Sequence, residues 1–331
     1  MKVLVTGGAG YIGSTIASAC LDAGITPVIL DSLVEGRREF VRDRIFYEGD
    51  IADGALIDQV FADHPDIEAV VHCAALIVVA ASVADPVRFY EWNVAKSLQM
   101  VRHLLRHNCH RLVFSSSASI YKPDDSYTVT EESAIQPNSP YAGTKAVCEQ
   151  MFADIAASTP IKILSLRYFN PIGADPKLRT GLQTKHPTHV LGKLVESHTT
   201  GVPFPITGVS YGTRDGSGIR DYIHVWDLAN AHVAALTKFD EVLGDASAMP
   251  VNVGSGNGVT VRELVAAFNS VVGTPLTVVE APARPGDVPG VYTRSDRARE
   301  LLGWAPAYSI AEGIEHALAW AQIRDEVLGD D

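Results

Sequence analysis

The sequence is poor in cysteine, and the few cysteines it has are far apart. Only 4 of the 331 residues are cysteines, and no two of them form a Cys-x-x-Cys pair. Disulfide frameworks and structural zinc sites need closer, repeated spacings. We therefore expect free thiols in a reducing compartment. The 11 histidines are scattered without ligand spacing, so no metal site is predicted.

Positive charge and long apolar runs are also scarce. The formal net charge is -12, whereas nucleic acids and anionic membranes bind basic surfaces. No apolar run reaches the ~18 residues of a membrane span, and no signal-peptide pattern precedes the first strand pattern. We therefore expect a cytoplasmic protein with no nucleic-acid partner and no membrane partner.

Short β-branched runs alternate with helical stretches through the first half of the chain. Such runs are typical of a parallel sheet that is buried on both faces, with right-handed helical crossovers. We predict an α/β fold with a doubly wound parallel (Rossmann) sheet. The strand runs are residues 3–5, 28–30, 45–47, 69–71, 112–114 and 163–166, and the helical stretches include residues 12–23, 87–106 and 144–157.

Glycine and proline become more frequent after about residue 170. Residues 171–218 indicate a loop with one helix near residues 189–198, and helices are predicted at residues 225–236 and 261–272, the second after the N-cap Thr260. A short strand is expected at residues 251–253, and a frayed tail beyond Ile323. We predict a domain of residues 1–170, to which residues of about 219–255 return, and a smaller C-terminal α/β domain within residues 171–331.

A glycine-rich loop directly follows the first strand pattern. Gly8, Gly10 and Gly13 fit G-x-G-x-x-G, and Gly7, Gly10 and Gly13 fit a looser form. One glycine makes the turn, another lets backbone N–H groups approach a pyrophosphate, and the last lets the helix pack closely on the strand. The positive end of the helix then faces the phosphates, so the loop predicts dinucleotide binding.

Asp31 ends the second strand pattern, close to the spacing of about 20 residues expected for an acid that binds the ribose. Its carboxylate can accept hydrogen bonds from a 2′-hydroxyl and repels a 2′-phosphate, which favours NAD over NADP. Arg37 and Arg38 are a contrary signal, because an arginine nearby can hold that phosphate. We interpret both arginines as the solvated start of a helix.

Tyr141 and Lys145 lie one helical turn apart, after a proline that suits a first turn. A neighbouring ammonium lowers the pKa of a phenol, and a phenolate can take a proton from an alcohol that loses a hydride. Ser115, Ser116 and Ser117 follow an apolar strand, at the edge of the sheet where ligands bind. One of these hydroxyls can bond the substrate oxygen as it becomes a carbonyl.

With these features the chain resembles the UDP-glucose 4-epimerases, within the extended short-chain dehydrogenase/reductases. The resemblance implies that the first domain binds NAD, that the second binds a UDP-sugar, and that a homodimer forms through helices at residues 87–106 and 141–157. It runs from Gly7 to about Pro306 and is carried by residues 6–14, 49–51, 72–76, 114–121, 140–145, 167–171, 218–227 and 284–289.

The resemblance also implies individual roles. Tyr141 would be the acid and base, Lys145 would bind the nicotinamide ribose and tune Tyr141, and Ser117 would hold the reacting hydroxyl. The other cofactor contacts would be Gly7, Gly10, Tyr11, Ile12, Gly13, Asp31, Asp50, Ile51, Ala74, Ala75, Asn93, Ser115 and Phe169. The other substrate contacts would be Asn170, Thr188, His189, Arg220, Arg284 and Asp287, where the guanidinium groups suit a diphosphate.

The implied reaction inverts the 4-hydroxyl of the sugar. Tyr141 would take the hydroxyl proton while a hydride passes from C4 to NAD. The resulting 4-keto sugar would then turn about its diphosphate linkage, and the hydride would return to the opposite face.

Several positions depart from the family. Ile77 stands where well-known members have a lysine and Trp92 where they have an asparagine, which puts the tightness of NAD binding in doubt. Thr188 and His189 replace an Asn-Leu pair that helps to bind the nucleotide sugar. Val291 stands where a bulky tyrosine restricts the sugar pocket in some members, and a small residue there goes with acceptance of N-acetylated sugars.

The sugar therefore stays open. Glucose and galactose come first, with the N-acetylated pair and the glucuronate/galacturonate pair as alternatives. A glucuronate enzyme would need Arg179, Lys185, His186 or His189 to meet a carboxylate, although we interpret this segment as a solvated loop. A 4,6-dehydratase usually has Thr-Asp-Glu at residues 117–119, where this chain has Ser-Ala-Ser. A decarboxylase, a net reductase and a non-catalytic NAD sensor are further alternatives; the sensor typically lacks the Tyr/Lys pair.

Overall fold

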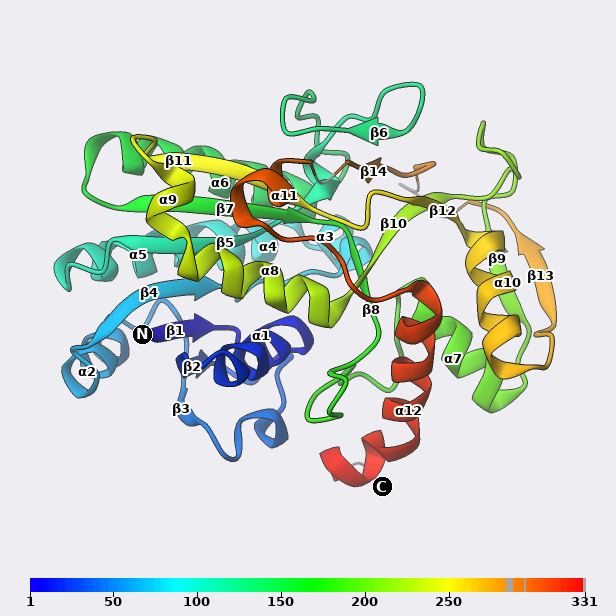
Figure 1. The fold of residues 1–331 in the computed structure, drawn as a ribbon, viewed down its shortest axis with the longest axis horizontal. Coiled ribbons are helices and arrows are strands. Elements are labelled where there is room, and N and C mark those ends of the chain that lie inside the picture. Colours follow the sequence, from blue (N-terminus) through cyan, green and yellow to red (C-terminus); the bar gives the residue numbers. More distant parts are fainter. Residues whose placement is uncertain (284–287, 295, 330–331) are drawn as a thin grey trace.

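A parallel seven-stranded sheet forms the centre of the molecule (Figure 1), and the predicted doubly wound α/β fold is confirmed. This computed structural model describes residues 1–283, 288–294 and 296–329. The strand order is β11-β7-β5-β4-β1-β2-β3. These strands are β1 (Lys2–Thr6), β2 (Thr26–Asp31), β3 (Ile45–Glu48), β4 (Ile67–His72), β5 (Arg111–Ser117), β7 (Lys162–Tyr168) and β11 (Ala248–Val253).

The strand order reverses beside β1, since β2 and β3 lie on one side and β4, β5, β7 and β11 on the other. The loops that leave β1 and β4 therefore diverge to opposite faces of the sheet. In open α/β sheets, ligands bind in the crevice at such a switch point, beyond the carboxyl ends of the strands.

Two apolar cores lie on the two faces of the sheet. On one face, α1 (Tyr11–Asp22) and α8 (Val225–Thr237) pack against the sheet and against each other. The helices on the other face include α2 (Gly54–Asp63), α5 (Lys96–Arg106) and α6 (Pro140–Ser158). The shorter elements of this part are η1 (Arg38–Val41), α3 (Val79–Ala84), α4 (Pro86–Tyr90), η2 (Glu91–Ala95), η3 (Ala118–Ile120), α9 (Phe239–Leu243) and α11 (Asp296–Leu302).

A second group of elements lies beyond the carboxyl edge of the sheet, on the right of Figure 1. Its own apolar core includes Phe204, Tyr222, Phe268 and Ile314. The group contains β8 (Asn170–Ile172), β10 (Ile219–His224) and β12 (Gly258–Thr260) in one sheet, the pair β9 (Phe204–Thr207) and β13 (Val278–Ala281), and helices α7 (Val190–Thr200), α10 (Val261–Val272) and α12 (Ile310–Leu328). A further pair, β6 (Thr128–Val129) and β14 (Tyr292–Thr293), covers one end of the main sheet.

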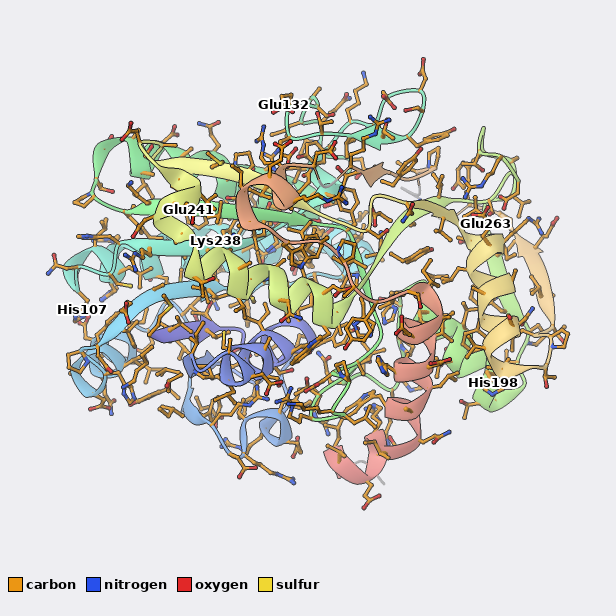
Figure 2. All side chains as sticks on the ribbon, in the orientation of Figure 1. His107, Glu132, His198, Lys238, Glu241 and Glu263 are labelled. Carbon is orange, nitrogen blue, oxygen red and sulfur yellow. The ribbon has the colours of Figure 1, made fainter. Side chains whose placement is uncertain are left out.

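The helix predicted at residues 261–272 begins and ends as expected, with Thr260 as its N-cap. Glu263, on α10 in Figure 2, completes a capping box because its carboxylate accepts the Thr260 backbone N–H at 2.8 Å.

Two local predictions were wrong, and a third was incomplete. The segment predicted as loop between residues 171 and 218 contains β9 and most of β8, which are too short to show a period. The helix predicted at residues 87–106 is present as the continuous run of α4, η2 and α5, and it contains a π-helical turn, Glu91–Ala95, that the sequence did not predict. The tail beyond Ile323 is not frayed: α12 continues to Leu328, which is buried and whose carbonyl accepts an Arg37 N–H at 3.0 Å.

None of the helices in the described ranges is both long enough and apolar enough to cross a membrane.

Candidate functional site

The glycine-rich loop lies against the loop that follows β4. Gly7 has a left-handed φ of 71°, and a Cβ there would come within 2.6 Å of the Ala74 nitrogen. A Cβ on Gly13 would come within 2.2 Å of the Gly7 carbonyl oxygen. Gly10 is more open, with its nearest neighbour at 3.5 Å, and it begins α1 without a capping side chain. The first N–H groups of α1 therefore have no side-chain acceptor, which fits a pyrophosphate.

Asp31 holds this loop in place from the end of β2. One of its carboxylate oxygens accepts the Ala9 N–H at 2.9 Å, and the other accepts the Leu33 N–H at 2.8 Å. Burial raises the pKa of Asp31, and the two backbone N–H groups oppose that shift. Each oxygen keeps a second lone pair, so the carboxylate can also accept ribose hydroxyls.

The interpretation of Arg37 and Arg38 as a solvated helix start is only half right. Arg38 begins η1, is exposed, and pairs with Glu48. Arg37 instead donates to the Leu328 carbonyl at the end of α12, and its Nε lies 3.4 Å from Glu39. Both guanidinium groups are thus engaged with protein groups rather than with solvent alone.

Tyr141 and Ser117 come together where β5 ends and α6 begins. Both side chains are buried, with 9% exposure each. Burial raises the pKa of Tyr141, and a hydrogen bond with Ser117 lowers it. The Lys145 ammonium donates to the Ser115 carbonyl at 2.8 Å. Burial lowers the pKa of Lys145 itself.

The other two serines have different partners. Ser116 points to the opposite face of the sheet from Ser115 and Ser117, because successive side chains on a strand alternate between faces. The Ser115 hydroxyl lies 3.0 Å from His232 Nε2 and 3.0 Å from Cys73 Sγ. His232 Nδ1 donates to the Leu228 carbonyl at 2.9 Å, so its Nε2 accepts from Ser115. Ser116 donates to Glu149. Ser117 is therefore the serine that meets Tyr141.

A buried ion pair behind these residues was missed from the sequence. Glu149 lies one further turn along α6 from Lys145, and Arg167 Nε donates to both of its oxygens at 3.0 Å. Arg167 also donates to the Tyr121 hydroxyl at 2.7 Å. Because β7 supplies Arg167 and α6 supplies Glu149, the pair fixes α6 against the sheet. The four-residue spacing from Lys145 places Glu149 on the same face of α6, but no local pattern pairs it with Arg167.

Asn93 braces the loop after β4. Its amide oxygen accepts the Leu76 N–H at 2.8 Å, and its amide nitrogen donates to the Leu76 carbonyl and to Thr144, both at 3.0 Å. The predicted contact of Asn93 with the cofactor stays a prediction. Ala74 and Ala75 belong to this loop, next to the glycine-rich loop.

Other predicted cofactor residues lie around the same crevice. The Tyr11 hydroxyl donates to the Gly173 carbonyl at 2.6 Å and so joins α1 to the second group of elements. Ile12 packs against the core between the sheet and α8. Ile51 is buried in the core on the opposite face of the sheet. Asp50 pairs with Lys96.

The predicted substrate residues lie where the second group of elements meets the main sheet. Phe169 is buried in a cluster with Tyr121, against which Val291 packs. The Asn170 amide donates to the Asp221 carbonyl at 3.1 Å. Arg220 on β10 donates to the Ile219 carbonyl at 2.7 Å and to the Val288 carbonyl at 3.1 Å. Arg284 and Asp287 lie outside the described residues.

His189 is the N-cap of α7, because its Nδ1 accepts the Gly192 N–H at 3.2 Å. Its Nε2 is buried without a hydrogen-bond partner, which fits a polar ligand atom. Burial lowers the pKa of His189 to about 4, so the ring is neutral at physiological pH. Thr188 lies exposed beside it.

The cations that a sugar carboxylate would need are mostly engaged elsewhere. Arg179 is bound to Asp22 at 2.9 Å and to Asp175 at 2.5 Å, on the outer side of α1. His186 lies 3.6 Å from Glu196. The solvated-loop interpretation is therefore wrong for Arg179, whose charge ties this loop to α1.

The fold and the glycine-rich loop define a protein of the dinucleotide-binding α/β class, with Tyr141, Lys145 and Ser117 grouped at the carboxyl edge of its sheet. The chain matches the sequence model of the NAD dependent epimerase/dehydratase family over residues 3–254, and it belongs to this family. It is 42% identical to a UDP-glucose 4-epimerase of Azospirillum brasilense, over 99% of this chain and 94% of that protein. It is 38% identical to a UDP-glucose 4-epimerase of Rhizobium meliloti, over 98% of each.

Solved structures agree with this assignment. The UDP-glucose-4-epimerase from Stenotrophomonas maltophila, with bound NAD and formylated UDP-arabinopyranose, superposes with a TM-score of 0.93 at 32% identity, covering 98% of this chain and 99% of that one. The UDP-Glc/GlcNAc 4-epimerase from Campylobacter jejuni gives a TM-score of 0.81 at 31% identity, covering 97% and 99%. The resemblance drawn from the sequence is confirmed, and NAD is the cofactor of this family.

We predict that Gly13→Ala disrupts the cofactor loop, because the new Cβ would lie 2.2 Å from a backbone oxygen that cannot move independently. NAD affinity, measured by titration calorimetry, should fall at least about tenfold. Gly10→Ala, with its nearest neighbour at 3.5 Å, should leave the melting temperature of the cofactor-free protein unchanged. Wild-type NAD affinity in the Gly13 variant would contradict this account of the loop.

Proposed function

We propose that this protein is a UDP-glucose 4-epimerase that interconverts UDP-glucose and UDP-galactose with bound NAD. The observation that carries the proposal is the buried Tyr141 beside Ser117, one helical turn before Lys145, at the carboxyl edge of a sheet with a dinucleotide loop. Relatives that align over almost the whole chain carry the same activity in their names.

We assign NAD to residues 1–170 with residues of about 219–255, and the UDP-sugar mainly to residues 171–331. Backbone N–H groups of the glycine loop would hold the pyrophosphate, Asp31 a ribose, and Asp50 with Ile51 the adenine. The nicotinamide half would meet Ala74, Ala75, Asn93, Ser115, Lys145 and Phe169.

NAD, held by these residues, would supply a hydride acceptor for C4 of the sugar and a hydride donor for the opposite face of the 4-keto sugar. Tyr141 moves the matching proton on the 4-hydroxyl oxygen, while Ser117 donates a hydrogen bond to that oxygen. The pKa of Tyr141 is raised by burial in the ligand-free protein, so the phenol there is protonated. An oxidised nicotinamide would supply a positive charge, which would favour the phenolate of Tyr141 and so its role as a base.

Substrate rotation needs an anchor at the diphosphate. Arg220 supplies a guanidinium there, already oriented by backbone carbonyls. Asn170, Thr188 and His189 would complete the nucleotide-sugar site, together with Arg284 and Asp287. The hexose can then turn over while the nucleotide stays bound.

The N-acetylated sugar pair is a second candidate substrate. Val291 is half-buried and packs on the cluster that contains Phe169, where a larger side chain would reduce the space. The glucuronate/galacturonate pair has less support, because Arg179 and His186 are bound to carboxylates of the protein.

We further propose a cytoplasmic homodimer. All four cysteines are free. Apolar side chains are exposed along α3, α4 and α5 and on the neighbouring α6, with Val87 at 75% and Val83 at 59% exposure. A continuous apolar surface of this kind is typical of an interface, and a second copy of the chain can cover it with the same helices.

Tyr141→Phe removes the hydroxyl that moves the proton and keeps the ring. We expect kcat for UDP-glucose to fall by about 100-fold or more, while the NAD content of the purified protein stays the same. Chromatography of UDP-glucose and UDP-galactose checks the first result, and release of the nucleotide by denaturation checks the second. A Phe variant with wild-type turnover would exclude the proposed base.

Val291→Tyr places a bulky ring beside the sugar. We expect kcat/KM for UDP-N-acetylglucosamine to fall by about ten- to a hundredfold, because a pocket discriminates through lost space. The same variant acting on UDP-glucose is the control and should change much less. Equal losses for both sugars would show that Val291 does not face the N-acetyl position.

Val87→Asp places a charge on the proposed dimer surface. Multi-angle light scattering should show a dimer for the wild type and a monomer for this variant, because desolvation of a carboxylate opposes association. Val202→Asp is the control: Val202 is similarly exposed, at 61%, but follows α7 in the other part of the molecule. A wild-type monomer, or a dimeric Val87 variant, would contradict the assignment.

A further inference from the structure

The π-helical turn Glu91–Ala95 brings two side chains of the β4–β5 crossover to the edge of the site. Asn93 braces Leu76, as described above. Trp92 packs on a buried cluster formed by Leu76, Phe89 and Tyr141. Wide turns of this kind interrupt helices most often at functional sites. Trp92 thus supports the cluster that contains Tyr141, the proposed base. We call Trp92 together with this cluster the Trp92 wall.

Lys96 lies between the Trp92 wall and the loop after β3, which contains Asp50. Its ammonium is 3.5 Å from the centre of the Trp92 ring and 2.5 Å from Asp50 Oδ2. Both distances lie within the range of direct interaction, and the Lys96 side chain is only 17% exposed. Desolvation of this kind strengthens a cation–π contact and an ion pair relative to fully exposed ones.

The two partners of Lys96 belong to different parts of the sheet. Asp50 follows β3, and its other oxygen accepts the Ala52 N–H at 2.8 Å. Trp92 belongs to the crossover that leaves β4. Since β1 and β2 lie between β4 and β3, Lys96 connects loops on both sides of the strand that carries the glycine loop.

We propose that Lys96 is a positioning residue that retains the dinucleotide by fixing the Asp50 loop to the Trp92 wall. This inference rests on the proposed function, in which Asp50 meets the adenine and Tyr141 the nicotinamide end. A carboxylate oxygen bound to Lys96 keeps a lone pair, so Asp50 can still accept from the adenine amino group. Lys96 touches no reacting atom, so its loss should affect cofactor retention far more than the chemical step.

Lys96→Met tests the proposal, because methionine keeps most of the aliphatic stem and removes the charge. We expect the dissociation constant for NAD, measured by titration calorimetry, to rise by about tenfold. This is the effect expected when a partly buried ion pair and a cation–π contact are lost together. The protein should also lose NAD during gel filtration. At saturating NAD, kcat for UDP-glucose should change by less than about threefold.

Three companion variants make the result specific. Lys96→Arg keeps the charge and the cation–π contact and should restore most of the affinity. Trp92→Leu should weaken NAD binding, and the double variant with Lys96→Met should lose less than the sum of the two. Lys2→Met is the matched control. The Lys2 side chain is 21% exposed, and the substitution removes its ion pair with Asp66, 2.8 Å long, at the amino end of β1. Its NAD affinity should be unchanged.

Wild-type NAD affinity in Lys96→Met would overturn the proposal, and so would equal losses in kcat and affinity. If the Met variant does not fold, Lys96→Gln gives the same comparison, and unchanged affinity there would overturn the proposal as well. A wild-type protein that neither binds NAD nor epimerises UDP-glucose would instead refute the proposed function. Normal NAD binding without epimerisation would leave the Lys96 inference standing and remove only the assigned reaction.

Discussion

The placement of the buried Tyr141 beside Ser117 is the constraint on which the rest of the site depends. It joins the first turn of α6 to the end of β5, in a place where burial raises the pKa of the phenol. The neighbouring contacts hold these two elements together: Lys145 donates to a β5 carbonyl, and Glu149 binds Arg167 on β7. One face of α6 therefore carries the base, the ammonium beside it and the ion pair that fixes the helix. This arrangement removes several charged groups from water, which costs free energy. The cost is offset because each of these groups has a hydrogen-bond or ion-pair partner.

The two groups of elements are joined around the cofactor loop rather than at one hinge. Tyr11 in α1 bonds the carbonyl of Gly173, and Arg37 bonds the last turn of α12. Phe40 and Trp320 add an aromatic contact with ring centres 5.8 Å apart. The C-terminal helix thus supports the loop that follows Asp31, the last residue of β2 and the aspartate expected at the ribose. The side chains of α1, α12 and the segment after β2 thus hold the two groups of elements together.

The sequence predicts the features that depend on local pattern. The parallel sheet, the glycine loop, the Thr260 cap and the spacing of Tyr141 and Lys145 can all be read from runs and short motifs. The buried pair of Glu149 and Arg167 cannot, because two charged residues are expected at the surface and only tertiary packing brings them together. The π-helical turn and the strands β8 and β9 were missed for a related reason: they are a few residues long and are set by their neighbours rather than by periodicity.

The central claim is that a carbon-bound hydrogen leaves C4 of the sugar and returns to it without exchanging with water. UDP-glucose labelled with deuterium at C4 tests this most directly, with mass spectrometry and NMR of the UDP-galactose formed. The account predicts that the deuterium is retained at C4, with no added cofactor consumed and no solvent hydrogen incorporated. Loss of the label to water would contradict it, because the proton would then have been removed from carbon and the hydride step would not exist.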